Sequence, residues 1–167
     1  MSNNTGNSFN PQIAASGNNV YVTWVDLTPA NLDILFAASN NNGTSFGTPI
    51  NISNNAGGSV SPQLAAVDNN VYVTWIDTTP GNFDILFAVS NNNGASFGPS
   101  INLSNNAGQS SNPQIAVSGN NNVYVTWIDN TPGNFDIFVI TNAQPFGTPI
   151  NISNNPGSSE NPQIAVS

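Results

Sequence analysis

Short apolar runs, separated by clusters of Gly, Pro and Asn, cover the chain from one end to the other. The first four runs lie at residues 12–16, 20–25, 33–38 and 49–53, and β-branched and aromatic residues dominate the longer ones. Runs of this length are too short for helices and are typical of strands. The Gly and Asn residues between them accept the positive φ that tight hairpin turns require. The pattern therefore predicts an all-β chain of antiparallel strands.

The same four runs occur three times, and the first run occurs a fourth time. A Pro-Gln-(Ile/Leu)-Ala sequence opens each copy at a spacing of about 51 residues, which is typical of a repeat architecture. Its copies begin at Pro11, Pro62, Pro113 and Pro162. The predicted repeats span residues 10–60, 61–111 and 112–160, and residues 161–167 form an extra first strand.

The third repeat differs from the first two in its turns. It gains one Asn within residues 120–122 and loses three residues between Asp136 and Phe146. Turns tolerate such changes, whereas a strand would lose its register. The placement of these changes supports the strand boundaries that the apolar runs predict.

Four antiparallel strands in about fifty residues match one blade of a β-propeller, in which four-stranded sheets surround a central channel. Runs such as 20–22 and 34–36 are apolar at every position, as expected when neighbouring sheets cover both faces. Closed propellers have about four to eight blades, so three blades would leave an apolar face open at each end of the stack. We expect self-association to cover these faces.

Two ways of completing the fold follow from this count. Two chains would make a six-bladed ring, whereas a rotation per chain that does not divide the circle would give a filament. In a ring, one first strand per chain, at Gln12 or at Gln163, would be redundant or would pair across chains as a donated strand, and strand exchange is the preferred hypothesis. Alternatively, the chain is a segment of a longer array of blades.

Composition removes several classes of function. The chain of 167 residues contains no Lys, Arg, His or Cys and has a formal net charge of −8, which excludes nucleic acid and disfavours anionic membrane surfaces as partners. Each carboxylate must be solvated, hydrogen-bonded or bound to an external cation. A Ser nucleophile would have no His or Lys to activate it. We therefore expect no enzymatic activity. We find no signal peptide and no apolar run long enough to cross a membrane.

Two turns between the predicted third and fourth strands carry the sequence Ser-x-Asn-x-Gly-x-Ser-Phe. They resemble the Asp-box, or BNR repeat, of sialidase-like β-propellers, Ser/Thr-x-Asp-x-Gly-x-Thr/Ser-Trp/Phe, which in that family joins the third and fourth strands of a blade. Asn replaces Asp in both copies, and residues 141–146 of the third copy have lost the box. The matching residues are Ser39, Asn41, Gly43, Ser45, Phe46, Ser90, Asn92, Gly94, Ser96 and Phe97.

The resemblance implies a propeller fold and marks the fold rather than an activity. The Asx side chain caps its own turn, the Gly takes positive φ, and the aromatic ring fills the blade edge. Family members that cleave sialic acid use an arginine cluster, a Tyr/Glu nucleophile pair and an acid. This chain has no arginine, and Glu160 is its only Glu. The resemblance therefore points to a non-catalytic, degenerate member of the family.

Six of the eight acidic residues recur at two positions per repeat, one at each end of the loop between the second and third strands. They are Asp26, Asp33, Asp77, Asp84, Asp129 and Asp136. In a propeller, this loop would place a ring of carboxylate pairs on one face. The Asp side chains could cap their turns by accepting backbone N–H bonds, or they could hold Ca²⁺ together with the amide oxygen of Asn31, Asn82 or Asn134.

The chemistry of the carboxylate pairs separates these interpretations further. Three near-identical pairs argue against glycoside hydrolysis, because a catalytic pair would break the repeat symmetry. Carboxylates that only repel one another would have raised pKa values, whereas carboxylates that hold a metal would have lowered ones. Apart from this Ca²⁺ site, the sequence predicts no cofactor.

Asn-x-Ser/Thr sequences recur along the chain and indicate N-glycosylation. Candidate sites are Asn3, Asn42, Asn51, Asn102 and Asn151, three of which share one repeat position. Such sites favour an extracellular or cell-surface protein in a glycosylating host. The tryptophans Trp24, Trp75 and Trp127 lie inside predicted strands, where packing in the core is favoured over stacking on sugar rings.

Two functions remain open at this point. The first is a non-catalytic building block that assembles with itself, head to tail, into a ring or filament. The alternative is a lectin-like module that binds glycans, with or without Ca²⁺, through its Asp and Asn loops. Glycan recognition calls for exposed aromatic side chains beside polar groups, and these loops contain few aromatic residues. Self-assembly is therefore the preferred hypothesis.

Overall fold

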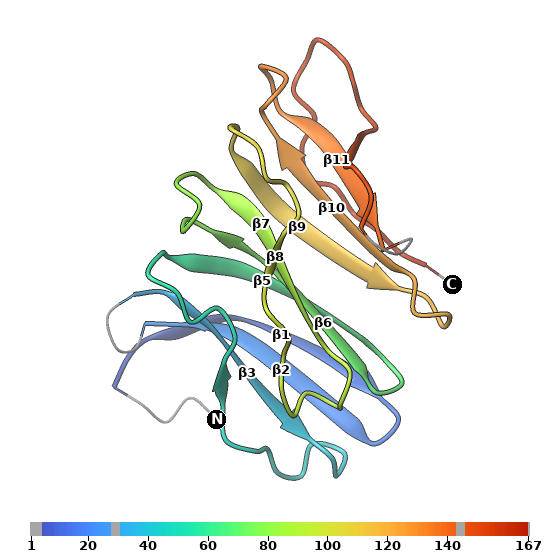
Figure 1. Ribbon diagram of the computed structural model, residues 1–167. Coiled ribbons are helices and arrows are strands. Elements are labelled where there is room, and N and C mark those ends of the chain that lie inside the picture. The colour runs from blue at the N-terminus through green and yellow to red at the C-terminus, as the bar shows by residue number, and fades with distance from the viewer. Residues whose placement is uncertain (1–4, 28–30, 143–145, 167) are drawn as a thin grey trace.

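The computed structural model describes residues 5–27, 31–142 and 146–166 and contains three four-stranded antiparallel sheets (Figure 1). The first sheet contains β1 (Ser8–Ser16), β2 (Asn19–Asp26), β3 (Asp33–Ser39) and β4 (Ile50–Asn51). The second contains β5 (Ser59–Val67), β6 (Asn70–Asp77), β7 (Asp84–Ser90) and β8 (Ile101–Asn102). The third contains β9 (Ser110–Val117), β10 (Val123–Asp129), β11 (Asp136–Thr141) and β12 (Ile150–Asn151).

The predicted all-β fold of propeller blades is confirmed. In every sheet the strands follow one another in chain order, and the three sheets stack side by side like the blades of a fan, as Figure 1 shows. The first strands of the sheets, β1, β5 and β9, lie next to one another. No described residue is helical, so the described part of the chain has no helix that could span a membrane.

The first strands begin earlier than the apolar runs suggest, at Ser8, Ser59 and Ser110. In β1, a register shift separates Phe9 and Gln12, and Asn10 within it has a φ of 52°. The Pro that follows cannot donate a backbone hydrogen bond, so the strand passes it through a bulge. The fourth strands are only two residues long. Residues 161–166, the predicted extra first strand, pair with no strand of the described chain.

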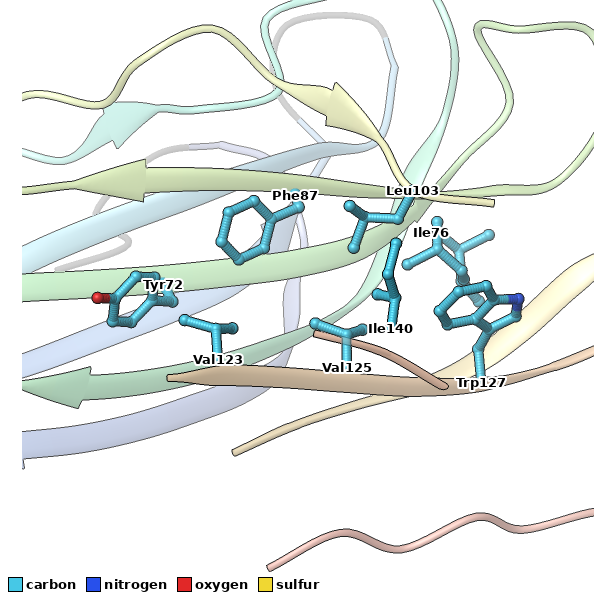
Figure 2. Packing of buried hydrophobic residues seen from close by; sticks show 9 residues of the cluster. Tyr72, Ile76, Phe87, Leu103, Val123, Val125, Trp127 and Ile140 are labelled. Atoms are coloured by element: carbon cyan, nitrogen blue, oxygen red, sulfur yellow. The ribbon is translucent and has the colours of Figure 1, made fainter. Parts of the chain in front are cut away.

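Alternate residues of each blade face the two neighbouring sheets, so the core lies between sheets. Tyr72, Phe87 and Leu103 of the second sheet meet Val125 and Trp127 of the third in one buried cluster, which Figure 2 shows from close by. Two further clusters fill the space between the first and second sheets. They contain Val25, Ile34, Val73, Trp75, Leu86 and Ala88, and Tyr21, Phe36 and Val71.

The same alternation leaves one apolar face open at each end of the stack. The first flank, defined here as the face of sheet one turned away from sheet two, contains Ile13, Val22, Trp24, Leu35, Ala37 and Phe46. The last flank, the face of sheet three turned away from sheet two, contains Tyr124, Ile128, Ile137, Val139 and Ile152.

Exposure at matched repeat positions identifies these faces. Ile13 on the first flank is 70% exposed, whereas its counterpart Leu64 packs against the core clusters between sheets one and two. Ile152 on the last flank is 60% exposed, whereas its counterpart Leu103 is only 4% exposed. Each flank therefore exposes an apolar position that is covered wherever a neighbouring blade is present.

Candidate functional site

The six recurring aspartates form three cross-strand pairs at the ends of the central hairpins. Asp26 pairs with Asp33, and the same register joins the two pairs in the other sheets. All six side chains are buried, with at most 3% of their surface exposed. Each pair joins the end of a second strand to the start of a third. The structure thus places the predicted carboxylate pairs at equivalent positions in every blade.

The first aspartate of each pair accepts hydrogen bonds from neutral groups. In the second blade, Asp77 accepts bonds from the Thr79 backbone N–H (2.7 Å), Ser59 Oγ (2.8 Å), Asn55 Nδ2 (2.8 Å) and Trp75 Nε1 (2.9 Å). Burial raises the pKa of Asp77, but hydrogen bonds from Thr79, Trp75 and Asn55 outweigh it and hold the pKa below its usual value. The charged carboxylate therefore stabilises this end of the blade.

The same arrangement recurs in the third blade around Asp129. Its carboxylate accepts bonds from Ser110 Oγ (2.6 Å), Asn106 Nδ2 (2.7 Å) and the Thr131 N–H (2.8 Å). Burial again raises the pKa, and the hydrogen bonds from Ser110, Thr131 and Asn106 lower it further than burial raises it. Asn106 belongs to the connection that leaves the second sheet. This hydrogen bond therefore ties each blade to the one before it.

The second aspartate of each pair binds the start of the next connection. Asp84 accepts bonds from Asn102 Nδ2 (2.7 Å) and Ser104 Oγ (2.9 Å), and Asp33 and Asp136 bind the equivalent Asn and Ser. The hydrogen bonds from Asn151 and Ser153 hold the pKa of Asp136 below its usual value. The pKa values of Asp77, Asp129 and Asp136 are thus lowered by hydrogen bonds from neutral groups. A lowered carboxylate pKa in this protein therefore does not by itself indicate a bound metal.

The predicted amide ligands of Ca²⁺ point their nitrogen atoms at protein oxygens. Asn31 donates from Nδ2 to the carbonyl oxygens of Asn55 and Gly57, both at 2.9 Å. Asn82 and Asn134 repeat these contacts in the next two blades. Among the described residues, no group of three or more Asp or Glu side chains gathers in one place. The geometry fits turn capping, and the Ca²⁺ site stays a prediction.

The Ser-x-Asn-x-Gly-x-Ser-Phe segments lie between the third and fourth strands. In the first blade, Asn41 Oδ1 accepts bonds from Ser39 Oγ (2.8 Å) and the Ser45 N–H (3.0 Å), and Ser39 Oγ accepts from the Gly43 N–H (3.0 Å). Gly43 has a φ of 79°, which favours Gly. Residues 90–97 repeat these bonds and bring Phe97 edge-on to Phe36 of the first sheet.

The added Asn of the third repeat lies beside the strand that leads into the shortened turn, since Asn142 Nδ2 donates to the carbonyl oxygen of Asn121 at 2.9 Å. Between the first two sheets, Asn93 Oδ1 accepts bonds from Asn19 Nδ2 (3.1 Å) and Tyr21 Oη (3.4 Å). Between the second and third sheets, Asn121 takes this role and accepts from Asn70 Nδ2 (2.8 Å) and Tyr72 Oη (3.3 Å). The added Asn thus supplies the contact that the lost turn would have made.

The predicted glycosylation sites differ in their surroundings. Asn42 is exposed at the edge of the first flank. The amide nitrogens of Asn51, Asn102 and Asn151 donate to aspartates of their own blades at 2.7–2.9 Å. Asn3 lies outside the described residues. We therefore expect Asn42 to be modified in preference to the three repeated sites.

The three tryptophans are buried, as packing in the core requires. Trp24 is 4% exposed, and Trp75 and Trp127 are fully buried. The indole nitrogens of Trp24 and Trp75 donate to Asp26 and Asp77 at 3.3 and 2.9 Å. The indole nitrogen of Trp127 has no hydrogen-bond partner, and its ring stacks on Phe138 instead.

Comparison with known proteins shows a likeness in fold and none in sequence. No protein-family model matches the chain, and no curated protein matches it. Among solved structures, an α-L-arabinanase of Penicillium chrysogenum is 13% identical, with a TM-score of 0.61 over 82% of this chain and 47% of that one. An ulvan lyase is 10% identical, with a TM-score of 0.64 over 90% of this chain and 45% of that one. A microbial sialidase is 9% identical, with a TM-score of 0.61 over 80% of this chain and 35% of that one.

These similarities identify the chain as a set of blades with the β-propeller fold. The chain spans less than half the length of each of these structures. At identities this low, the likeness concerns the fold alone, since unrelated functions share one fold.

Proposed function

We propose that the protein is a non-catalytic propeller segment that assembles with itself, head to tail. One observation carries the proposal: each flank exposes an apolar side chain, Ile13 or Ile152, at a position that is covered wherever two blades meet. Burial of apolar surface contributes about 25 cal/mol per Å², so exposed Ile13 and Ile152 favour association. Two copies of three blades would form a six-bladed ring.

The polar contacts between blades support the same pairing. Each internal interface joins a Tyr and an Asn of one blade to the Oδ1 atom of an Asn in the next. Tyr124 and Asn122 occupy the Tyr and Asn positions on the last flank. Asn42 on the first flank is the counterpart of Asn93, with φ values of 56° and 59°. The last flank of one copy is thus complementary to the first flank of another.

The proposal includes the turn motif and the absence of catalysis. Residues 39–46 and 90–97 serve as Asp-box turns in which Asn replaces Asp, and the hydrogen bonds of Asn41 support this role. The chain contains no Arg, His or Lys, so the arginine clamp of sialic-acid cleavage has no counterpart. The buried, capped aspartates act as structural groups in this proposal.

The experiment is sedimentation analysis of the wild-type chain and two matched variants. Ile152→Glu places a charge on the last flank, and Ile101→Glu places one on β8 at a position that is 47% exposed and lies away from both flanks. The wild type and I101E are expected at twice the chain mass of 17.4 kDa, and I152E at 17.4 kDa. A mass that grows without limit would indicate an open filament. A wild type of 17.4 kDa at every concentration would contradict the proposal.

Carbohydrate binding is the second candidate function. The structural neighbours act on carbohydrates, as their names state. A groove between sheets one and two is lined by the amides of Asn19, Asn40, Asn92 and Asn93 beside Phe46, and such groups can recognise sugar hydroxyls. A screen against a glycan array, with and without Ca²⁺, tests this alternative. Binding that disappears in the Asn40→Ala variant would favour it, because Asn40 lines the groove without taking part in the hydrogen bonds of the 90–97 turn.

A further inference from the structure

We propose that residues 159–166 are a donated first strand, which replaces residues 8–15 on strand β2 of a second copy. This inference rests on the proposed self-assembly and defines the contact that joins two copies. The relevant surface is the end of sheet three, where the chain leaves β12 toward its C-terminus (Figure 1).

The chain leaves all three sheets in the same way. The Ser59 and Ser110 N–H groups donate to the carbonyl oxygens of Leu32 and Phe83 at 2.7 and 2.8 Å, and each Ser begins the first strand of the next blade. The Ser159 N–H donates to the carbonyl oxygen of Phe135 at 2.7 Å. Residues 159–166 therefore start where the first strand of a following blade would start.

The segment also has the local structure of a first strand. Asn161 has a φ of 56°, close to the values of 53° and 52° for Ser61 and Asn112 before the prolines of β5 and β9. Pro162 is buried, as are Pro62 and Pro113. The segment lies beside β9 as β9 lies beside β5, because all three line one polar groove. The lining residues are Ser61, Gln63, Asn112, Pro113, Gln114, Asn161, Pro162 and Gln163.

Two hydrogen-bond donors at this end of the molecule lack the carboxylate that their counterparts bind. Asn55 and Ser59 both donate to Oδ2 of Asp77, and Asn106 and Ser110 both donate to Oδ2 of Asp129. Asn155 and Ser159 instead bond to each other at 2.9 Å.

In the two internal cases, the acceptor is the aspartate that ends the second strand of the following blade. The equivalent residue on the first flank of a second copy is Asp26, at the end of β2. This carboxylate already binds the Ser8 hydroxyl at 2.6 Å within its own chain, so Ser159 would take over the place of Ser8. The donor pair thus fits β2 of a second copy.

Strand β1 is the natural element to be replaced. Residues 161–165 are identical to residues 10–14, Asn-Pro-Gln-Ile-Ala, so an exchanged strand would keep the register in which Ile13 opposes Val22. Pro11 and Ser8 are exposed, whereas the corresponding residues of β5 and β9 are buried. β1 therefore has the fewest contacts to lose, and the unpaired segment has a strand partner to gain.

Disulfide trapping tests the exchange, because the chain has no Cys of its own. Directly opposed residues of an antiparallel pair lie about 4.5–5.5 Å apart between Cα atoms, within the range of a disulfide. A chain carrying Ile164→Cys is mixed with one carrying Val22→Cys under mild oxidation. The matched control replaces V22C with Val20→Cys, two residues along the same face of β2. The masses of all samples are measured before oxidation.

The I164C and V22C chains are expected to form a covalent heterodimer that reductant dissociates, and the V20C control is not. Ser159→Ala is expected to weaken association about tenfold, as loss of a hydrogen bond to a charged group predicts. Dimers of normal mass without this cross-link would overturn the exchange and leave self-assembly standing. Samples that stay at the mass of one chain would overturn both.

Discussion

Replacement of the buried tryptophans by phenylalanine tests the hydrogen-bonding scheme inside the blades. Trp75 and Trp127 occupy the same repeat position and are both fully buried. Each substitution removes a similar apolar volume. The two positions differ in the indole N–H, which donates to Asp77 at 2.9 Å in one blade and has no partner in the other.

The expected difference follows from the cost of making or losing this bond. Trp75→Phe removes a hydrogen bond to a charged group, which contributes about 1.5–3 kcal/mol. Trp127→Phe removes a buried donor without a partner, and such a donor costs about 1–3 kcal/mol. Trp75→Phe should therefore reduce the free energy of unfolding by about 2.5–6 kcal/mol more than Trp127→Phe. Trp24, whose bond to Asp26 is 3.3 Å long, should give an intermediate value.

The assay is urea denaturation followed by far-UV circular dichroism at neutral pH. Circular dichroism is preferred because the substitutions alter tryptophan fluorescence directly. All variants are compared at one chain concentration, since association changes the apparent stability. Equal free energies of unfolding for W75F and W127F, within about 0.5 kcal/mol, would refute the reasoning. So would a larger loss for W127F.

Three further predictions follow from the same contacts. The folded-state pKa of Asp77 is lowered, so the contribution of its carboxylate to stability is complete above the unfolded pKa of about 3.9 and is lost as the pH falls through the folded pKa. The melting temperature should therefore stay constant from about pH 7 to about pH 5, fall toward about pH 3, and be the same with and without a chelator. A melting temperature that the chelator lowers would instead indicate bound metal. Gly94→Ala should destabilise the fold by about 1–3 kcal/mol more than Gly43→Ala. Both glycines have positive φ, but a Cβ on Gly94 would lie 2.6 Å from the ring of Phe36. Equal reductions of the melting temperature in the two variants would contradict this. Asn42 is exposed in the single chain and lies on the first flank, so a chain made in a glycosylating host should carry a glycan on Asn42 and, because the glycan blocks that flank, stay at the mass of one chain; peptide mapping that finds a glycan on Asn42 of an assembled particle would contradict the proposed interface.

Most of the fold could be predicted from local patterns. The apolar runs and the Gly, Pro and Asn clusters located the second and third strands, because alternation and turn chemistry act between near neighbours in sequence. The bulge at Asn10 and the short fourth strands depend on pairing with distant residues. A sequence pattern carries little information on such pairing.

The candidate site was predicted only in part, for a related reason. The recurrence of Asp77 and its equivalents drew attention to the correct position in each blade. The Asp77 partner Ser59 lies opposite it on β5, and its partner Asn55 belongs to the connection from the preceding sheet, so pairing of distant strands and the path of the connection bring them together. The same holds for Asn121, whose link to Tyr72 replaces a lost turn. The sequence feature that could have identified Asn55 and Ser59 as partners of Asp77 is the Asn-x-x-x-Ser spacing, which recurs where β5 and β9 begin.

The mass of the particle in solution tests the central claim most directly. If the flanks are complementary and close a ring, native mass spectrometry across a wide concentration range will find a species of twice the 17.4 kDa chain mass, and the Ile152→Glu variant will be found at the mass of one chain. A wild-type protein that remains a single chain at every concentration, with both flanks in contact with water, would contradict the account.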